Sequence, residues 1–168
     1  DYLAKFSKLM RHVLESSQLN DVTLARELDI LNAYIDLERM RLRGKFDVVV
    51  EVAPEVDQQS TTVPPLILQP FVENAIWHGL SRKEGQGQLR IEVTQRNDAL
   101  LVAIQDDGVG REIAKAPTGH DEGKTSLGTT ITRDRLELLA TQRGAYAGFE
   151  FVPVAKGTRV EVVLPLAS

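Results

Sequence analysis

The chain has 168 residues, of which 42% are hydrophobic, and this is enough apolar material to bury the core of one domain. It has a net charge of -4, no cysteine and no run of eighteen apolar residues. These properties exclude disulfide scaffolds and thiolate metal sites, argue against nucleic acid as a partner, and predict neither a membrane-spanning nor a secreted chain.

The first two predicted elements are helices. Apolar residues recur at helical spacing across residues 2–17, YLAKFSKLMRHVLESS, and no capping residue precedes them. A second helix is expected at about residues 24–43, with Thr23 as its N-cap and Gly44 at its end. Because the first helix begins uncapped at the start of the chain, we expect the sequence to be a fragment of a larger protein.

A strand and a third helix are expected next. Apolar residues alternate with polar ones across residues 46–52, which predicts a strand with one covered face. After a polar loop at 53–62, a helix is expected with Pro65 in its first turn and Gly79 at its end. Pro70 inside that helix would cost about 3 kcal/mol, so the helix should either kink there or restart with Pro70 in its first turn.

This third helix is predicted to have two unlike sides. At 100° per residue, its apolar residues fall on one side and a polar arc falls opposite. The polar arc consists of Glu73, Asn74, Trp77 and His78. One side is therefore expected to pack into the core, while the other serves a different purpose.

The second half of the chain is expected to hold two hairpins on either side of a loop and a helix. The expected elements are strands at 88–95 and 99–105, a mobile loop at 106–125, a helix at 127–142 capped by Thr125 or Ser126, and strands at 146–154 and 158–164. The complete order of elements predicts an α+β fold, a sandwich with helices on one face of a mixed sheet.

Two glycine-rich segments bear on ligand binding. Asp106-Asp107-Gly108-Val109-Gly110 ends a buried strand, where it is either a tight turn with positive φ at both glycines or a site for a planar base. In the second case the carboxylate would accept a hydrogen bond from an amino group of the base. Residues 123–128 lead into a helix, so their free N–H groups could bind phosphate.

Glu73 and Asn74 form a third motif. A neutral Asn oxygen suits Mg²⁺, which takes its other ligands from water and substrate phosphates, and Glu73 could orient or deprotonate a nucleophile. Alternatively, both side chains are simply solvated or cap a loop. His78, beside Gly79, is either a structural helix cap or a catalytic group.

Taken together, these motifs resemble the N, G1, G2 and G3 boxes of the GHKL superfamily. The order is Glu-Asn-Ala-x-x-His-Gly, Asp-x-Gly-x-Gly, a glycine-bearing lid, and Gly157-Thr158. The strings VPPLILQPFVENAIWHGL and LARELDILNAYIDLERMRLRGKF resemble the LytS/YehU-like sensor histidine kinases. This resemblance implies a two-layer α/β sandwich of the Bergerat type after a short helical segment. Residues 1–19 would be a remnant of the dimerisation and phosphoacceptor region, and 20–168 the catalytic ATP-binding domain.

The resemblance also implies roles for individual residues. Asn74 corresponds to the Mg²⁺ ligand, Glu73 to the acidic residue that activates the acceptor, and Asp106 to the aspartate that reads the adenine amino group. Gly108 and Gly110 would shape the base pocket. The remaining expected nucleotide contacts are His78, Lys124, Leu127, the lid residue Gly128, and Thr158 behind the aspartate.

Some positions depart from the family pattern. Trp77 stands where Lys or Arg is common, so Lys124 or Arg82 would have to supply the phosphate contact. Asp107 replaces an Asn and adds negative charge, and the lid pattern is altered at Ser126 and at residues 129–131. The acceptor motif Asn-Pro-His-Phe does not occur in the sequence, and His12 and His120 are poor substitutes for it.

The resemblance thus implies the catalytic domain of a two-component sensor histidine kinase, which transfers the γ-phosphoryl group of ATP to a histidine upstream of this sequence. A response regulator, a homodimeric full-length protein and a cytoplasmic domain anchored in the inner membrane are the further expectations. Two alternatives remain: a nucleotide-binding regulatory module without phosphotransfer, and an ATPase of the gyrase or chaperone type.

Overall fold

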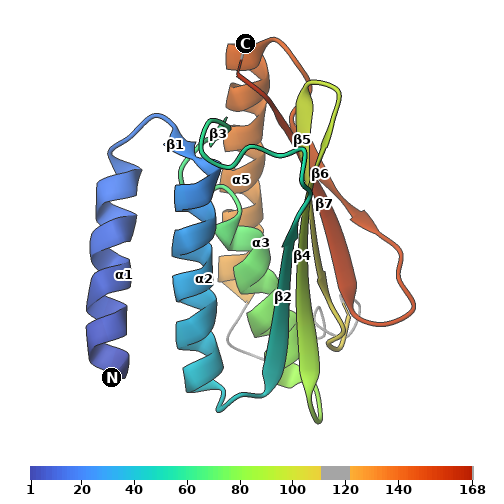
Figure 1. Cartoon of the computed structure of the whole chain (residues 1–168). Helices are drawn as coiled ribbons and strands as arrows, with labels where there is room; N and C mark the ends of the chain where they lie inside the picture. Colours follow the sequence, from blue (N-terminus) through green and yellow to red (C-terminus); the bar gives the residue numbers. More distant parts are fainter. Residues whose placement is uncertain (111–121, 168) are drawn as a thin grey trace.

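A five-stranded mixed sheet, covered on one face by helices, forms the body of the protein (Figure 1). The computed structural model describes residues 1–110 and 122–167, and the side chains of all of these except 122–129. The helices are α1 (Tyr2–Ser17), α2 (Leu24–Arg41), α3 (Gln69–Asn74) and α5 (Glu122–Arg143), with a π-helical turn η1 (Ala75–Gly79) and a 3-10 turn η2 (Leu80–Arg82) after α3. The strands are β1 (Val22–Thr23), β2 (Phe46–Val52), β3 (Thr62–Val63), β4 (Gly87–Arg96), β5 (Ala99–Asp106), β6 (Gly148–Val152) and β7 (Thr158–Pro165).

The order of strands in the large sheet is β2-β4-β5-β7-β6. The β2–β4 pair is parallel, and the other neighbours are antiparallel. In this register Asp106, the last residue of the central strand β5, lies opposite Thr158 on β7 and Leu89 on β4. The predicted α+β sandwich with helices on one face of a mixed sheet is confirmed, and β1 and β3 add a two-stranded antiparallel sheet that the sequence did not indicate.

The core lies between the sheet and the helices. Side chains of β4 and β5 alternate between buried and polar, so each strand gives one apolar face to the core. The helices α2, α3 and α5 cover that face, and α1 packs on the outer side of α2 (Figure 1). No helix in the described part of the chain is long and apolar enough to cross a membrane.

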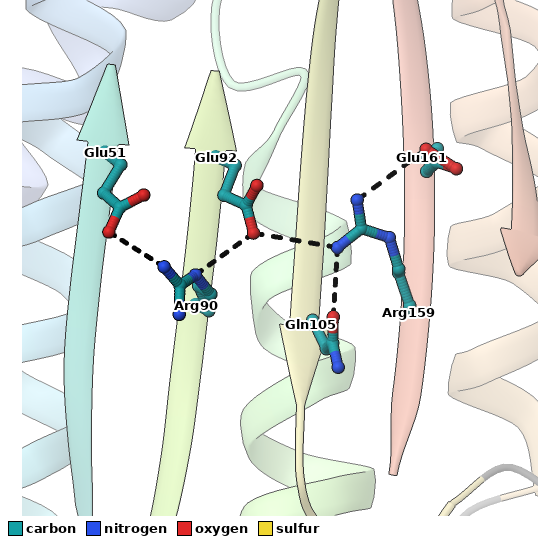
Figure 2. A network of polar contacts seen from close by, with 6 residues as sticks. All are labelled: Glu51, Arg90, Glu92, Gln105, Arg159 and Glu161. Carbon is teal, nitrogen blue, oxygen red and sulfur yellow. Dashed lines mark hydrogen bonds and ion pairs between the residues drawn. The ribbon is translucent and has the colours of Figure 1, made fainter. Parts of the chain in front are cut away.

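The opposite face of the sheet is polar. Figure 2 shows a chain of ion pairs that crosses it, in which Arg90 contacts Glu51 at 2.9 Å and Glu92 at 3.1 Å. Arg159 continues the chain to Glu92 at 3.8 Å and to Glu161 at 3.9 Å. Charged side chains on alternate positions keep this face in water, which explains why the helices pack on the other one.

The first two helices agree closely with the sequence pattern. Thr23 caps α2 as predicted, since its side chain accepts the N–H of Arg26 at 3.2 Å. The expectation that α1 starts without a cap was wrong, because the Asp1 carboxylate accepts the N–H of Leu3 at 3.1 Å. Gly44 has the positive φ of 71° expected for a residue beyond a helix end.

Three predicted helix boundaries were wrong. Helix α3 restarts with Pro70 in its first turn, so Pro65 lies before the helix. Gly79 does not end the helical segment, because η1 and η2 carry it on to Arg82. Helix α5 begins at Glu122, so residues 123–128 form its first turns and neither Thr125 nor Ser126 caps it from outside. Packing of later residues of α5 on the sheet overrides the low helix propensity of this glycine-containing start. Residues 111–121, most of the expected mobile loop, lie outside the described residues.

Candidate functional site

The helical segment α3–η1 has the two unlike sides that its sequence predicts. Its apolar residues Phe71, Val72, Ala75 and Ile76 are buried in the core. The polar residues Glu73, Asn74 and His78 are half-buried, and Trp77 is exposed. The π-helical turn starts directly after Asn74. The backbone hydrogen-bonding pattern of the segment therefore changes in the middle of the polar arc, between Asn74 and Trp77.

Asp106 is the buried carboxylate next to this helix. It is 2% exposed, and its Oδ1 accepts the N–H of Gly108 at 2.9 Å. Burial raises the pKa of Asp106 to about 6, the Gly108 hydrogen bond opposes this shift, and neighbouring Asp107 adds to it. A carboxylate has about four acceptor sites, so Asp106 retains capacity to accept a donor from a ligand.

Three glycines allow separate segments to meet around Asp106. A Cβ on Gly79 would collide with the Asp106 carboxylate, and one on Gly108 would collide with the backbone of Gly79. A Cβ on Gly157 would collide with the Asp106 carbonyl oxygen. The tight-turn alternative required positive φ at both Gly108 and Gly110, but of these two only Gly110 has it, at 82°. Crowding, and not dihedral angle, therefore requires glycine at positions 79 and 108.

The carboxylate of Asp107 is bonded within the turn, so its negative charge is not unpaired. Its carboxylate accepts the N–H of Gln88 at 2.7 Å and pairs with the Lys83 ammonium at 3.1 Å. Lys83 thus offsets the negative charge that the sequence analysis expected to lie near a polyanionic ligand. No local pattern predicts this pairing, because Lys83 precedes β4 and Asp107 follows β5, and only the antiparallel pairing of these strands brings the two residues together.

Glu73 and Asn74 differ in their surroundings. The Gln69 side-chain amide, one helical turn earlier, donates to the Glu73 carboxylate at 3.2 Å and holds it in place. The Asn74 side chain has no hydrogen-bond partner among the described residues, which leaves its oxygen available. Within the same part of the chain, no cluster of three or more His, Asp or Glu side chains could hold a metal. A cation at Asn74 would therefore need phosphate and water ligands, and this suits Mg²⁺.

Trp77 packs against α2. The Arg41 guanidinium lies 4.1 Å from the centre of its ring, and the indole N–H donates to the Tyr34 hydroxyl at 3.3 Å. Arg41 in turn pairs with the largely buried Glu38. The residue that replaces the family's usual cation thus fastens η1 to α2.

The remaining predicted site residues are distributed as follows. Thr158 lies opposite Asp106 in the β5–β7 register, which brings the last motif beside this carboxylate. Lys124, Leu127 and Gly128 lie in the first turns of α5, and their side chains are outside the described residues. The roles of these residues and of His78 in nucleotide binding stay predictions.

Comparison with known families agrees with this arrangement. Residues 64–168 match the family described as histidine kinase-, DNA gyrase B- and HSP90-like ATPase, and residues 1–46 match the histidine kinase family. The chain is 30% identical over 171 residues to the sensor histidine kinase/phosphatase LytS of Staphylococcus aureus (strain MRSA252). It is 26% identical over 168 residues to the sensor protein LytS of Staphylococcus epidermidis (strain ATCC 12228). These alignments cover 98% and 99% of this chain but only 28% of each relative.

Solved structures show the same fold. The histidine kinase domain of the blue-light activated histidine kinase from Erythrobacter litoralis EL346 matches with a TM-score of 0.65 at 21% identity, covering 99% of this chain and 75% of that one. The catalytic domain of the histidine kinase ThkA matches with a TM-score of 0.59 at 12% identity, covering 88% of this chain and 96% of that one. The predicted family and fold are confirmed: the chain belongs to the histidine kinase-, DNA gyrase B- and HSP90-like ATPase family, and it is similar to LytS sensor histidine kinases over nearly its whole length.

Proposed function

We propose that this chain binds ATP with Mg²⁺ and transfers the γ-phosphoryl group to a histidine that lies outside it, as the catalytic domain of a two-component sensor histidine kinase. The observation that carries this proposal is the meeting of η1, the turn after β5 and the β6–β7 turn around the buried carboxylate of Asp106. These segments meet at a carboxylate that retains acceptor sites, which supports binding of an amino group of a base, and the family is an ATPase family.

Asp106 is the residue proposed to select adenine. Its carboxylate can accept the adenine amino group, while Gly108 and Gly110 let the backbone lie against the ring. A guanine base would present a carbonyl oxygen at the same place, and two acceptors repel each other. Lys124, Leu127, Gly128, His78 and Thr158 are proposed to complete the nucleotide site.

Asn74 and Glu73 are proposed to serve the transfer step. Asn74 would supply an oxygen ligand to Mg²⁺, which when bound neutralises charge on the phosphates. Glu73, held by Gln69, would orient or deprotonate the acceptor imidazole. Phosphoryl transfer asks a protein mainly for positioning and charge stabilisation, and this pair on one helix face fits that demand.

The larger assembly follows from the same proposal. Residues 1–19 would belong to the dimerisation and phosphoacceptor region and residues 20–168 to the catalytic domain. The full-length protein would be a homodimer that serves a response regulator and is anchored in the inner membrane, with this domain in the cytoplasm. The chain spans about a quarter of the length of its LytS relatives, so these partners concern the longer protein.

A second function, nucleotide-binding regulation without phosphotransfer, is favoured by the position of Trp77, which occupies a common cation position and packs on α2. Labelled ATP, Mg²⁺ and the upstream histidine-bearing segment of the natural protein separate these functions. Kinase activity gives phosphohistidine, and a regulatory module gives binding alone. An ATPase of the gyrase or chaperone type would release phosphate steadily without the acceptor segment.

Two substitutions connect this test to the residues. Asn74→Ala should abolish the Mg²⁺ dependence of ATP binding, and Glu73→Gln should keep nucleotide binding but slow single-turnover phosphorylation of the acceptor. An unchanged Mg²⁺ dependence would remove Asn74 as a metal ligand. An unchanged single-turnover rate would remove Glu73 from catalysis.

A further inference from the structure

The segment of residues 65–68, directly before α3, is held by charged side chains from two other helices. It contains Leu66 with φ of 60°, a left-handed conformation that is unfavourable for a residue other than glycine. Such a conformation persists only where the surroundings impose it. The contacts that hold this segment come from α2 and α5.

Glu27 of α2 supplies the negative side. It is 2% exposed, and its carboxylate accepts the N–H of Leu66 at 2.8 Å and the N–H of Leu68 at 3.2 Å. Burial raises the pKa of Glu27, and these two hydrogen bonds and nearby Arg135 oppose that shift. A carboxylate buried here satisfies two backbone donors that no helix could satisfy, since they precede the first turn of α3.

Arg135 of α5 supplies the positive side. Its guanidinium donates to the carbonyl oxygen of Pro65 at 2.6 Å and to that of Leu66 at 3.5 Å. Leu66 is thus bonded through its N–H to α2 and through its C=O to α5. We call Glu27, Arg135 and residues 65–68 the Glu27–Arg135 clamp.

The clamp lies where it can set the position of the polar arc. Helix α3 has only six residues, from Gln69 to Asn74, and it follows the clamped segment without a break. The hydrogen bonds of a helix join each residue to the one four positions earlier, so a displacement of the residues before α3 is passed on to its turns. A shift or rotation of residues 65–68 would therefore move Glu73 and Asn74 relative to Asp106, which is fixed on the sheet.

We propose that Glu27 and Arg135 are positioning residues for the nucleotide site, which hold α3 so that Asn74 reaches the metal-bound phosphates while Asp106 holds the base. This inference rests on the proposed function for the role of Asn74. The clamp also connects α2 and α5 to the segment that leads into α3, so these three elements are fixed relative to one another.

Arg143 offers a matched control for Arg135. It also lies on α5 and donates to backbone carbonyls, those of Thr62 and Pro165, and it pairs with Asp21. It does not contact residues 65–68 in the described structure. Loss of Arg143 should therefore lower overall stability, as loss of Arg135 does, without disturbing the start of α3.

The experiment compares Glu27→Gln, Arg135→Met, Arg135→Lys and Arg143→Met with the wild type. Amide hydrogen exchange is measured across α3, η1 and β4, and ADP affinity is measured with and without Mg²⁺. We expect Glu27→Gln and Arg135→Met to speed exchange in α3 and η1 relative to β4 by about tenfold, as for a locally loosened element. In the presence of Mg²⁺, the Kd for ADP should rise by about tenfold. In its absence, the Kd should change little.

The controls make the outcomes distinct. Arg135→Lys should restore part of the Mg²⁺-dependent affinity, and Arg143→Met should change neither readout at a similar loss of stability. Equal effects of Arg143→Met and Arg135→Met would overturn the proposal, as would faster exchange with unchanged Mg²⁺-dependent affinity. If wild type binds no nucleotide, the proposed function fails, while exchange in α3 still shows whether the clamp orders that helix. If Glu27→Gln does not fold, the Arg135 and Arg143 variants decide.

Discussion

Two buried carboxylates, Glu27 in the clamp and Asp106 at the proposed base site, have nearly the same burial but different surroundings. Each is 2% exposed, and burial raises the pKa of each. Glu27 accepts N–H groups from a distant segment and lies near the cation Arg135. Asp106 accepts a hydrogen bond from the N–H of Gly108, two residues away, and the negative charge of neighbouring Asp107 disfavours its ionised form.

The difference suggests a way to tell a structural carboxylate from one that is proposed to bind a ligand. The acceptor sites of Glu27 are directed at backbone donors that would otherwise be buried without partners. Asp106 has capacity left to accept a further donor, and Gly79 and Gly157 are required because its own carboxylate and carbonyl group lie so close to them. Burial alone does not mark a functional group. The balance between the donors that the chain supplies and the acceptor sites that the carboxylate offers is more informative.

The largest expected effect is on stability. Glu27→Ala leaves the part-buried N–H of Leu66 and the buried N–H of Leu68 without their acceptor, and an unsatisfied buried group costs about 1–3 kcal/mol. We expect the free energy of unfolding at pH 7 to fall by roughly 3–5 kcal/mol, given this cost and the cavity left behind. Asp106→Ala removes a desolvated charge with one local hydrogen bond, so it should change stability by no more than about 1 kcal/mol.

Urea unfolding monitored by circular dichroism measures both values. A change in the midpoint without a change in slope would confirm that the folded states are comparable. If Asp106→Ala destabilised the protein as much as Glu27→Ala, the two carboxylates would both be structural and the comparison would fail.

The second prediction concerns base selectivity. A hydrogen bond from an adenine amino group to a charged acceptor contributes about 1.5–3 kcal/mol, or roughly a tenfold to hundredfold preference for ADP over GDP. We expect Asp106→Ala to lose most of this preference. Glu27→Gln should retain it, even where its affinity for both nucleotides falls. The two nucleotides carry the same phosphates, so their affinity ratio isolates the base site. Equal wild-type affinity for ADP and GDP would make the Asp106 segment a turn only.

The third prediction follows from the pKa of Asp106, which burial raises to about 6. The ionised carboxylate is the better acceptor for the amino group, so nucleotide binding should favour loss of the proton. Affinity for ADP should therefore fall as pH drops from 7 to 5, by up to roughly tenfold if the protonated form does not bind. Calorimetric titration at several pH values measures this change.

Asp106→Asn is the control for that profile. Protonation of the nucleotide phosphates affects the wild type and the variant alike, so the ratio of their affinities should vary with pH only through Asp106. A constant ratio between pH 5 and 7 would show that the group does not titrate on binding. The stability effect has the opposite sign from that of most carboxyls: because the folded pKa is above the unfolded one, protonation of Asp106 favours folding below pH 3.8, and this contribution is lost as pH rises through about 6.

The smallest effect is expected from the exposed ion pairs on the other face of the sheet (Figure 2). Arg90→Gln removes the contacts with Glu51 and Glu92, and all three side chains are at least one-third exposed. Water screens such pairs, so stability should fall by no more than about 1 kcal/mol, and by less at high salt. A larger loss of stability that does not depend on salt, measured by urea unfolding, would mean that this network stabilises the fold as strongly as the buried carboxylate of Glu27.

Regular elements could be read from the sequence where one periodicity was uninterrupted. The strand at residues 46–52 and the helix at 2–17 have the predicted bounds, because alternating and helical apolar patterns depend on local geometry alone. The start of α5 and the place of Pro65 were wrong. At these positions glycine, proline and polar residues leave the local preference weak, so residue type alone does not fix the boundary.

The candidate site was predictable in part. The sequence indicated Asp106, Glu73 and Asn74 by residue type and order, and it expected glycine at the turn after β5. It explained Gly79 as a helix end, whereas the structure explains it by the approach of the Asp106 carboxylate. It noted that Trp77 removes a possible phosphate contact, but it did not indicate that the ring stacks with Arg41. These outcomes depend on the three-dimensional distance between segments, which no local pattern contains.

The sequence by itself determined the family, the order of helices and strands, and the two-sided helix that carries Glu73 and Asn74. Only the tertiary structure decided which charged groups are satisfied by the chain and which remain open to a ligand. Glu27 lies among ordinary helix residues in the sequence, yet its donors come from positions 39 and 41 residues further along. Asp106 finds its donor two residues away. Residue type fixes how many hydrogen bonds a carboxylate can accept, and the fold fixes how many donors reach it.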